Sequence, residues 1–226
     1  MKKISNFHLA IGIPLSFPMV PATFFYSFAH MDKTAEYTLI HADNGPVDTL
    51  RNDLVEKALQ IGASHLIMCD TDMDYHPDTI PRLLSHNLPI VGALCYRRYP
   101  PFDPILLRGE LGDYYSIDEW KDGELVEVDA TGAGCLLFNM EVFKKMPRPW
   151  FKFRHLEGGE GIGEDIGFCS DLKAAGYKIF VDTTVPSGHL TTMLVNHQTY
   201  MLYKSMKVIQ HQKSLEKALS SGEKEE

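Results

Sequence analysis

The sequence has few cysteines, and no pair of them has metal-binding or redox spacing. Four occur in 226 residues, and none belongs to a Cys-x-x-Cys motif: Cys69, Cys95, Cys135 and Cys169. This spacing argues against a zinc knuckle, a thioredoxin-type site and a secreted disulfide scaffold. We therefore expect buried, reduced thiols in a cytoplasmic protein.

Basic residues are also in deficit, because 22 Lys and Arg stand against 30 Asp and Glu, for a net charge of -8. This balance argues against non-specific nucleic-acid binding as the main function. No charged residue occurs between Lys3 and Asp32, as in a signal peptide. Three prolines interrupt this stretch, at Pro14, Pro18 and Pro21, so we expect a strand and a loop there instead of a membrane-inserted helix.

Apolar segments alternate in type along the first half of the chain. Unbroken or alternating apolar runs predict strands at 7–13, 37–41, 65–69 and 90–96. Helical spacing of apolar residues predicts helices at 22–30, 47–61 and 77–86. This order predicts the α/β class, with one Rossmann-like domain in which helices cover both faces of a mostly parallel sheet.

The second half of the chain is less regular. We expect a basic, aromatic loop at 97–104, which could hold an anionic acceptor or be a plain surface loop, and a hairpin over 109–128 that turns at Asp122-Gly123. Further expected elements are a strand at 135–138, a glycine-rich loop at 158–163, a strand at 178–181, and helices at 141–145, 164–175 and 197–219. The predicted domains are 1–196 and a helical extension with a frayed tail, 197–226.

Three carboxylates follow the predicted strand at 65–69, namely Asp70, Asp72 and Asp74. Clustered carboxylates repel one another unless a cation or hydrogen-bond donors compensate them, and ligands bind at this edge of an open α/β sheet. Mg²⁺ or Mn²⁺, which prefer oxygen ligands, would suit the cluster. The alternative is a solvated turn that caps the next helix, and Asp74 fits that role best.

Two further positions could carry chemistry. Glu164 and Asp165 open a predicted helix after the glycine-rich loop, so they are either capping residues or a general base delivered by that loop. His189 follows another predicted strand and is either a metal ligand or a satisfied polar residue.

Taken in order, these segments resemble the GT-A fold glycosyltransferases, especially the family 2-like group. The resemblance covers residues 7–190 and rests on a proline-bearing first strand, Arg51-Asn52, the run from Leu66 to Asp72, Gly132-Ala133-Gly134, Gly163-Glu164-Asp165 and Gly188-His189. It implies metal-dependent transfer of a sugar from a nucleotide-diphosphate sugar, with a UDP-sugar favoured, to an acceptor hydroxyl, with inversion.

The resemblance also implies roles for single residues. Asp70 and Asp72 would bind the Mn²⁺ or Mg²⁺ that bridges the diphosphate, His189 would be its third ligand, and Asp165 would be the base, paired with Glu164. Four positions would contact the nucleotide: Pro14, Asp43, Arg51 and Asp70. Three small residues would line the sugar of the donor or acceptor: Gly132, Ala133 and Gly134. The acceptor could be a glycan, a lipid-linked sugar, a protein or a modified nucleic-acid base.

Other functions remain open from the sequence. A haloacid-dehalogenase-like phosphatase would use Asp70 as nucleophile, but Asp74 stands where that motif has Thr or Val. A nucleotidyltransferase would need a Gly-rich, basic segment after the first strand, where this chain has prolines. A non-catalytic nucleotide-sugar binder is the third alternative. The C-terminal helix carries Lys204, Lys207, Lys213 and Lys217 beside apolar residues, which suits a homodimer contact, a helix that covers the domain, or a peripheral membrane helix.

Overall fold

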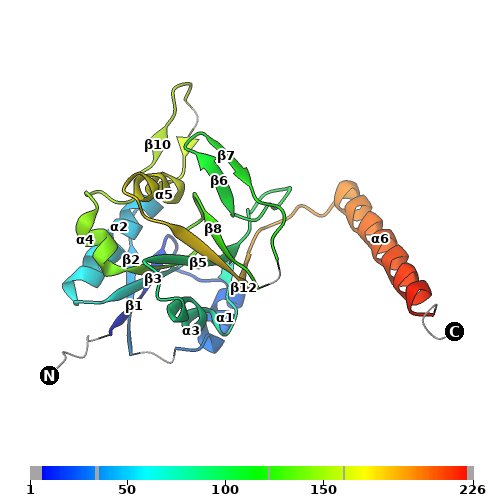
Figure 1. The fold of residues 1–226 in the computed structure, drawn as a ribbon, viewed down its shortest axis with the longest axis horizontal. Helices are drawn as coiled ribbons and strands as arrows, with labels where there is room; N and C mark the ends of the chain where they lie inside the picture. The colour runs from blue at the N-terminus through cyan, green and yellow to red at the C-terminus, as the bar shows by residue number, and fades with distance from the viewer. Residues whose placement is uncertain (1–6, 34–35, 122, 160, 223–226) are drawn as a thin grey trace. The chain divides into compact units, whose positions relative to one another are not determined.

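The computed structural model describes residues 7–33, 36–121, 123–159 and 161–222, with side chains described up to residue 209 in the last helix. The chain divides into two units, one ending at Leu190 and one beginning at Thr191. The first unit is a large sheet with helices on both faces, and the second contains helix α6 (His197–Gly222) (Figure 1). Within these described residues, every helix is too short or too polar to span a bilayer.

The main sheet of the described residues has eight strands. Its order is β2, β1, β3, β9, β5, β12 and β4, with β8 paired to the first half of β12. Their bounds are β1 (Leu9–Leu15), β2 (Tyr37–Asp43), β3 (His65–Cys69), β4 (Met73–Asp74), β5 (Ile90–Cys95), β8 (Leu125–Val128), β9 (Cys135–Asn139) and β12 (Ile179–His189). Strands β1, β2, β3, β5 and β12 run in one direction, and β4, β8 and β9 run in the other. The mixed α/β class with a mostly parallel sheet is therefore confirmed.

Alternating side chains on the strands build two apolar clusters, one on each face of the sheet. In β3, Leu66 and Met68 belong to one cluster, whereas Ile67 and Cys69 belong to the other. The first cluster is closed by α2 (Val47–Gln60), α4 (Met140–Lys145) and α5 (Glu164–Ala174), and the second by α1 (Ala22–His30) and α3 (Thr79–Ser85). Burial on both faces explains why β3 is an unbroken apolar run.

Helix α5 is fixed to the sheet by aromatic packing. Phe168 stacks on Phe143 of α4 with ring centroids 5.7 Å apart, and it meets Phe151 at 4.6 Å. All three rings are fully buried, and each aromatic pair adds about 0.5–1.5 kcal/mol beyond the burial of area. The N-terminus of α5 is thereby held at a defined place beside the sheet.

Several sequence predictions differ from the structure. The strand predicted at 178–181 is the first part of β12, which continues to His189. The first strand begins and ends two residues later than predicted, so Pro14 lies inside β1; this is tolerated because the pairing of β1 with β3 ends at Gly12. The hairpin predicted over 109–128 is wrong. The hairpin is formed by β6 (Leu107–Glu110) and β7 (Asp113–Ser116), with Gly112 at φ 93° in its turn, and β8 pairs with β12 instead. Asp122 of the predicted turn lies outside the described residues, as do Glu160 of the glycine-rich loop and residues 223–226 of the tail.

The topology brings four segments to one edge of the sheet. Asp70 follows the carboxyl end of β3, and Tyr96 follows the end of β5. Because β9 runs antiparallel to β3, the residues that precede β9 lie at this same edge. The last residue of β12, His189, pairs there with Met73 of β4. A short antiparallel pair, β10 (Arg154–His155) with β11 (Gly161–Ile162), precedes α5 in the chain.

Candidate functional site

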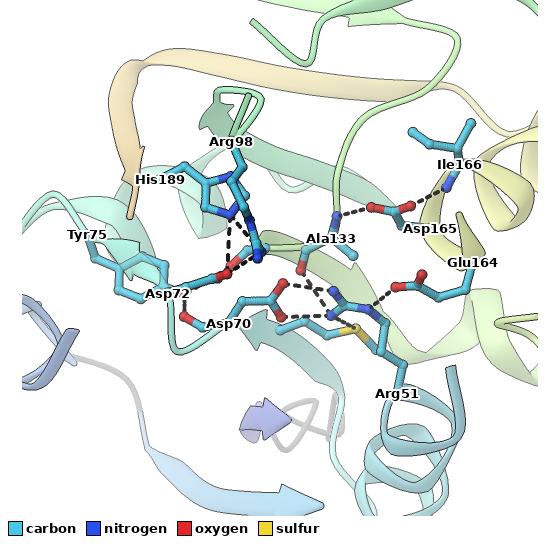
Figure 2. Close-up of polar contacts among 12 residues, drawn as sticks. Arg51, Asp70, Asp72, Tyr75, Arg98, Ala133, Glu164, Asp165, Ile166 and His189 are labelled. Carbon is cyan, nitrogen blue, oxygen red and sulfur yellow. Dashed lines mark hydrogen bonds and ion pairs between the residues drawn. The ribbon is translucent and has the colours of Figure 1, made fainter. Parts of the chain in front are cut away.

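A buried arginine joins two carboxylates at the carboxyl edge of the sheet. Arg51, on α2, is 2% exposed and donates from Nη1 and Nη2 to the two oxygens of Asp70, at 3.0 and 2.8 Å. Its Nε donates to Glu164 Oε1 at 2.8 Å (Figure 2). The guanidinium thus makes a bidentate pair with one acid and a single bond with the other, the strong geometry for such pairs.

The network of Arg51 shifts pKa values as well as fixing positions. Burial by itself would lower the pKa of Arg51, but the charge of Asp70 and that of Glu164 raise it above its ordinary range. Burial raises the pKa of Asp70, and Arg51 opposes this shift. Arg51 was predicted to contact the nucleotide, which stays a prediction; its side chain is enclosed, with its donors turned to protein carboxylates. Its place is that of a structural cation beneath the site.

A second, more exposed cluster contains the other acid of the Asp-x-Asp motif. Asp72 Oδ2 lies 3.3 Å from His189 Nε2 and accepts a hydrogen bond from Arg98 Nη2. Arg98 Nη2 is also 3.2 Å from His189 Nε2. The chain at Leu190 is tied to the same loop, because its backbone N–H donates to Asp72 O at 2.7 Å. The structure therefore brings Asp72 and His189 together, although 117 positions separate them.

The ring of His189 is oriented by the backbone. Its Nδ1 lies 2.9 Å from the carbonyl oxygen of Tyr96, and a carbonyl can accept but not donate, so Nδ1 carries a proton. In the neutral ring Nε2 then has a free lone pair directed at Asp72 and Arg98. This is the arrangement by which a second partner orients a metal-ligating histidine.

Mutual interaction shifts both pKa values. The hydrogen bond with Asp72 raises the pKa of His189 above its ordinary value, while burial and Arg98 oppose the shift. Burial would raise the pKa of Asp72, but the hydrogen bond with His189 and the charges of His189 and Arg98 bring it below its ordinary value. Asp72 is therefore a carboxylate at neutral pH, as a ligand for a cation must be.

Asp165 is the second residue of α5 and has a different environment. Its Oδ1 accepts from Ile166 N at 2.8 Å and its Oδ2 from Ala133 N at 3.3 Å. Burial, followed by the charge of the neighbouring Glu164, raises the pKa of Asp165 to about 6. Glu164 is held by Arg51, whereas Asp165 forms no ion pair with a lysine or arginine of the described residues. A carboxylate with a pKa close to neutrality is suited to accept a proton.

Three small residues, Gly132 to Gly134, lie between the two acidic groups. A Cβ on Gly132 would be 3.6 Å from Asp165 Oδ2, and a Cβ on Gly134 would be 3.5 Å from Asp70 Oδ2. The carbonyl of Ala133 accepts from Arg51, and its N–H donates to Asp165. This segment therefore lies against both carboxylates, and its role in lining the sugar of the donor or acceptor stays a prediction.

The two remaining predicted residues lie at the same sheet edge but outside these clusters. Pro14 is buried near the end of β1 and is paired with Ala42. Asp43 is exposed at the end of β2, and its Oδ1 accepts from the side chain of Asn44 at 2.9 Å. Their roles with a nucleotide stay predictions.

The described residues contain no cluster of three or more His, Cys, Asp or Glu arranged to hold a metal ion. Asp72 and His189 nevertheless provide one carboxylate and one oriented imidazole with lone pairs on the same side. Two protein ligands suit a divalent ion that retains waters and takes substrate phosphates, so the donor set fits Mn²⁺ or Mg²⁺. Both Asp70 oxygens are engaged by Arg51, which leaves Asp70 a less available ligand.

Sequence reasoning missed the partners of this site. The carbonyl of Tyr96 orients His189, and the hydroxyl of Tyr75 donates to the carbonyls of Asp70 and Gly134 at 2.7 and 2.9 Å. Arg98 was recognised as part of a basic loop but not as a partner of Asp72. Its place at the end of an apolar strand is the signal that could have located it at this edge.

Comparison with known proteins gives a likeness of fold. No protein-family model matches the chain, and no curated protein matches it. The crystal structure of A197 from STIV superposes with a TM-score of 0.55 and 15% identity, over 84% of this chain and 99% of that one. The crystal structure of GalNAc-T7 with UDP, GalNAc and Mn2+ superposes with a TM-score of 0.59 and 13% identity, over 84% of this chain and 45% of that one. The GT-A-like fold predicted from the sequence is thereby confirmed.

Proposed function

We propose that this protein is a metal-dependent glycosyltransferase of the family 2-like group. It would transfer a sugar from a nucleotide-diphosphate sugar, with a UDP-sugar favoured, to an acceptor hydroxyl with inversion. The GT-A-like fold supports this class, and so does its likeness to GalNAc-T7, whose crystal structure contains UDP, GalNAc and Mn2+. The metal, donor and stereochemistry belong to the proposal.

The close approach of Asp72 to His189 is the observation that best supports the proposal. A carboxylate and an imidazole from distant parts of the chain approach to 3.3 Å, and the imidazole has its other nitrogen fixed by Tyr96 O at 2.9 Å. A merely structural acidic turn would not need an oriented histidine. This pair would hold Mn²⁺ or Mg²⁺, and Asp70 would stand behind it, positioned by Arg51.

When bound, a divalent ion would stabilise the negative charge that grows on the leaving diphosphate. The remaining roles belong to the chain itself. Asp165 would accept the proton of the acceptor hydroxyl at one of its carboxylate oxygens, for which a pKa of about 6 is well matched. Glu164 would keep Asp165 basic through its own charge, and the Gly132–Gly134 segment would leave room for a sugar between Asp70 and Asp165.

The alternatives receive less support from these contacts. A phosphatase that uses Asp70 as nucleophile would need a free carboxylate oxygen, but both oxygens accept hydrogen bonds from Arg51. A nucleotidyltransferase has no further observation in its favour. A non-catalytic nucleotide-sugar binder would not require a carboxylate with a pKa raised to about 6 beside the glycine segment.

The proposal also includes binding partners other than the sugar donor. The acceptor is a hydroxyl compound such as a glycan, a lipid-linked sugar, a protein or a modified nucleic-acid base. We propose a cytoplasmic protein in which α6 serves as a homodimer contact or as a peripheral membrane helix. Large apolar side chains such as Tyr200, Leu202 and Met206 are exposed on α6 and are available for either role.

Donor hydrolysis tests the proposed function directly. Wild type should hydrolyse one member of a panel of UDP- and GDP-sugars slowly, and the rate should depend on Mn²⁺ or Mg²⁺. Asp72→Asn should reduce this rate by at least about 100-fold, because the variant loses a charged ligand. Asp74→Asn is the matched control, since Asp74 belongs to the same acidic segment but is exposed, and it should retain the rate.

Equal loss of rate in the Asp72 and Asp74 variants would contradict the assignment, as would metal-independent turnover. The nucleotide can be identified in the same samples, because a ligand that binds the folded state raises the melting temperature. NMR of the product anomer then distinguishes inversion from retention.

A further inference from the structure

Arg98 lies on the two atoms that would hold a cation in the proposed function, on which this inference rests. Its Nη2 donates to Asp72 Oδ2 and is 3.2 Å from His189 Nε2. Figure 2 shows Arg98 and His189 together above Asp72, with the contacts of all three converging. The side chain of Arg98 is 45% exposed, so it is not locked in place by packing.

The hydrogen-bond chemistry explains why a cation occupies this place. Since His189 Nδ1 donates to Tyr96 O, the neutral ring presents a lone pair at Nε2, and Asp72 presents further lone pairs 3.3 Å away. Two sets of lone pairs at that distance repel unless His189 Nε2 takes up a proton and donates it to Asp72, or a positive group lies against both. A guanidinium has donors alone, so Arg98 can satisfy the carboxylate and the imidazole simultaneously.

We propose that Arg98 and a divalent cation compete for Asp72 and His189, so that Arg98 is the resident cation of the metal-free site. A metal ion needs the same lone pairs on Asp72 Oδ2 and His189 Nε2. Binding of the ion therefore displaces the Arg98 guanidinium. The ion pair of Arg98 is lost at that step, which weakens metal binding relative to a site without it.

The displaced guanidinium has a natural second partner. In the proposed function the donor diphosphate lies next to the metal, and guanidinium groups bind phosphate oxygens with parallel hydrogen bonds. Arg98 would then pass from Asp72 to the diphosphate. Metal and nucleotide would thus bind cooperatively, and by linkage each would strengthen the other by the same factor.

Titration with Mn²⁺ alone tests the competition without requiring activity. Mn²⁺ is titrated into the full chain at constant ionic strength, and the electron paramagnetic resonance signal gives the concentration of free Mn²⁺ at each step. Arg98→Gln should bind Mn²⁺ up to about five-fold more tightly than wild type, the range expected for removal of an exposed ion pair. Arg97→Gln is the matched control, because Arg97 is the exposed neighbour in the same loop and forms no ion pair among the described residues; it should bind like wild type.

A second titration in the presence of UDP tests the transfer of Arg98. UDP should increase the Mn²⁺ affinity by a larger factor in wild type than in Arg98→Gln. An equal factor in both proteins would overturn that transfer. Equal or weaker Mn²⁺ binding by Arg98→Gln, with binding by wild type intact, would overturn the competition and leave the proposed function standing. No Mn²⁺ binding by either protein, each folded by circular dichroism, would overturn both.

Discussion

The two aspartates of the Asp-x-Asp motif each pair with an arginine, but the two pairs differ in burial. The side chains of Arg51 and Asp70 are 3% and 23% exposed, whereas those of Arg98 and Asp72 are 45% and 30% exposed. Arg51 has a further partner in Glu164, and Arg98 has one in His189. Pairing of an aspartate with an arginine therefore forms a buried network at Asp70 and an exposed pair at Asp72, two residues away.

Burial determines what each pair can do. A buried arginine cannot exchange its carboxylates for water, so removal of either partner leaves an uncompensated charge in the interior. An exposed arginine is exchanged at low cost, because water solvates both partners when they separate. The first pair thus supports the site, and the second is the one that a ligand can replace.

Substitution of Arg51 should give the largest effect. Arg51→Gln removes the charge that compensates Asp70 and Glu164, both held at 2.8 Å. We expect the free energy of unfolding to fall by about 3–5 kcal/mol, the range for a broken buried ion pair. Urea denaturation followed by circular dichroism measures this change. A loss below about 1 kcal/mol would mean that the network contributes no more than a surface pair.

Asp165 offers a test of a carboxylate that has no arginine of its own. Its pKa is raised from 3.8 to about 6 in the folded protein, so the folded state binds more protons than the unfolded state between these pH values. Stability therefore falls as pH rises through this window, and the full cost is present above pH 6. Asp165→Asn has no such titration and should be more stable than wild type near neutral pH, by on the order of 3 kcal/mol.

The pH dependence of that gain separates charge from packing. The difference in unfolding free energy between Asp165→Asn and wild type should shrink as the pH falls from 6 to 3.8, and it should approach zero below both values, where Asp165 is protonated in the folded and the unfolded state. A difference that does not change with pH would assign it to packing or hydrogen bonding. The same variant should transfer sugar at least about 100-fold more slowly if Asp165 is the base.

Local patterns predicted much of the fold and where several candidate residues lie in it. The apolar run 65–69 ends where β3 ends, so Asp70 and Asp72 were placed correctly at the carboxyl edge of the sheet. Arg51 could have been recognised as buried, because it lies beside Leu50 and Leu54 on the apolar face of α2. Its two partners could not be predicted, since pairing across 19 and 113 positions depends on how the strands are ordered in the sheet.

The β-structure between 107 and 128 shows the limit of such patterns. Asp122-Gly123 is good turn chemistry, but Leu111-Gly112 is also compatible with a tight turn, and it is the one that closes the hairpin. The segment 125–128 then pairs with β12, which lies far along the chain. Turn residues indicate where a chain can reverse, whereas the choice of partner strand follows from the remainder of the sheet.

Arg98→Gln should give the smallest change in stability. It therefore tests directly whether the exposed Arg98–Asp72 pair differs from the buried Arg51–Asp70 pair. Asp72 keeps its contact with His189 and its access to water when Arg98 is removed, so the unfolding free energy should change by less than about 1 kcal/mol. The change should decrease further at high salt, which screens exposed pairs. Urea denaturation at low and high salt measures both. A loss as large as that of Arg51→Gln would make Arg98 a fixed structural group, whereas a small loss is what a cation must show if a ligand is to displace it.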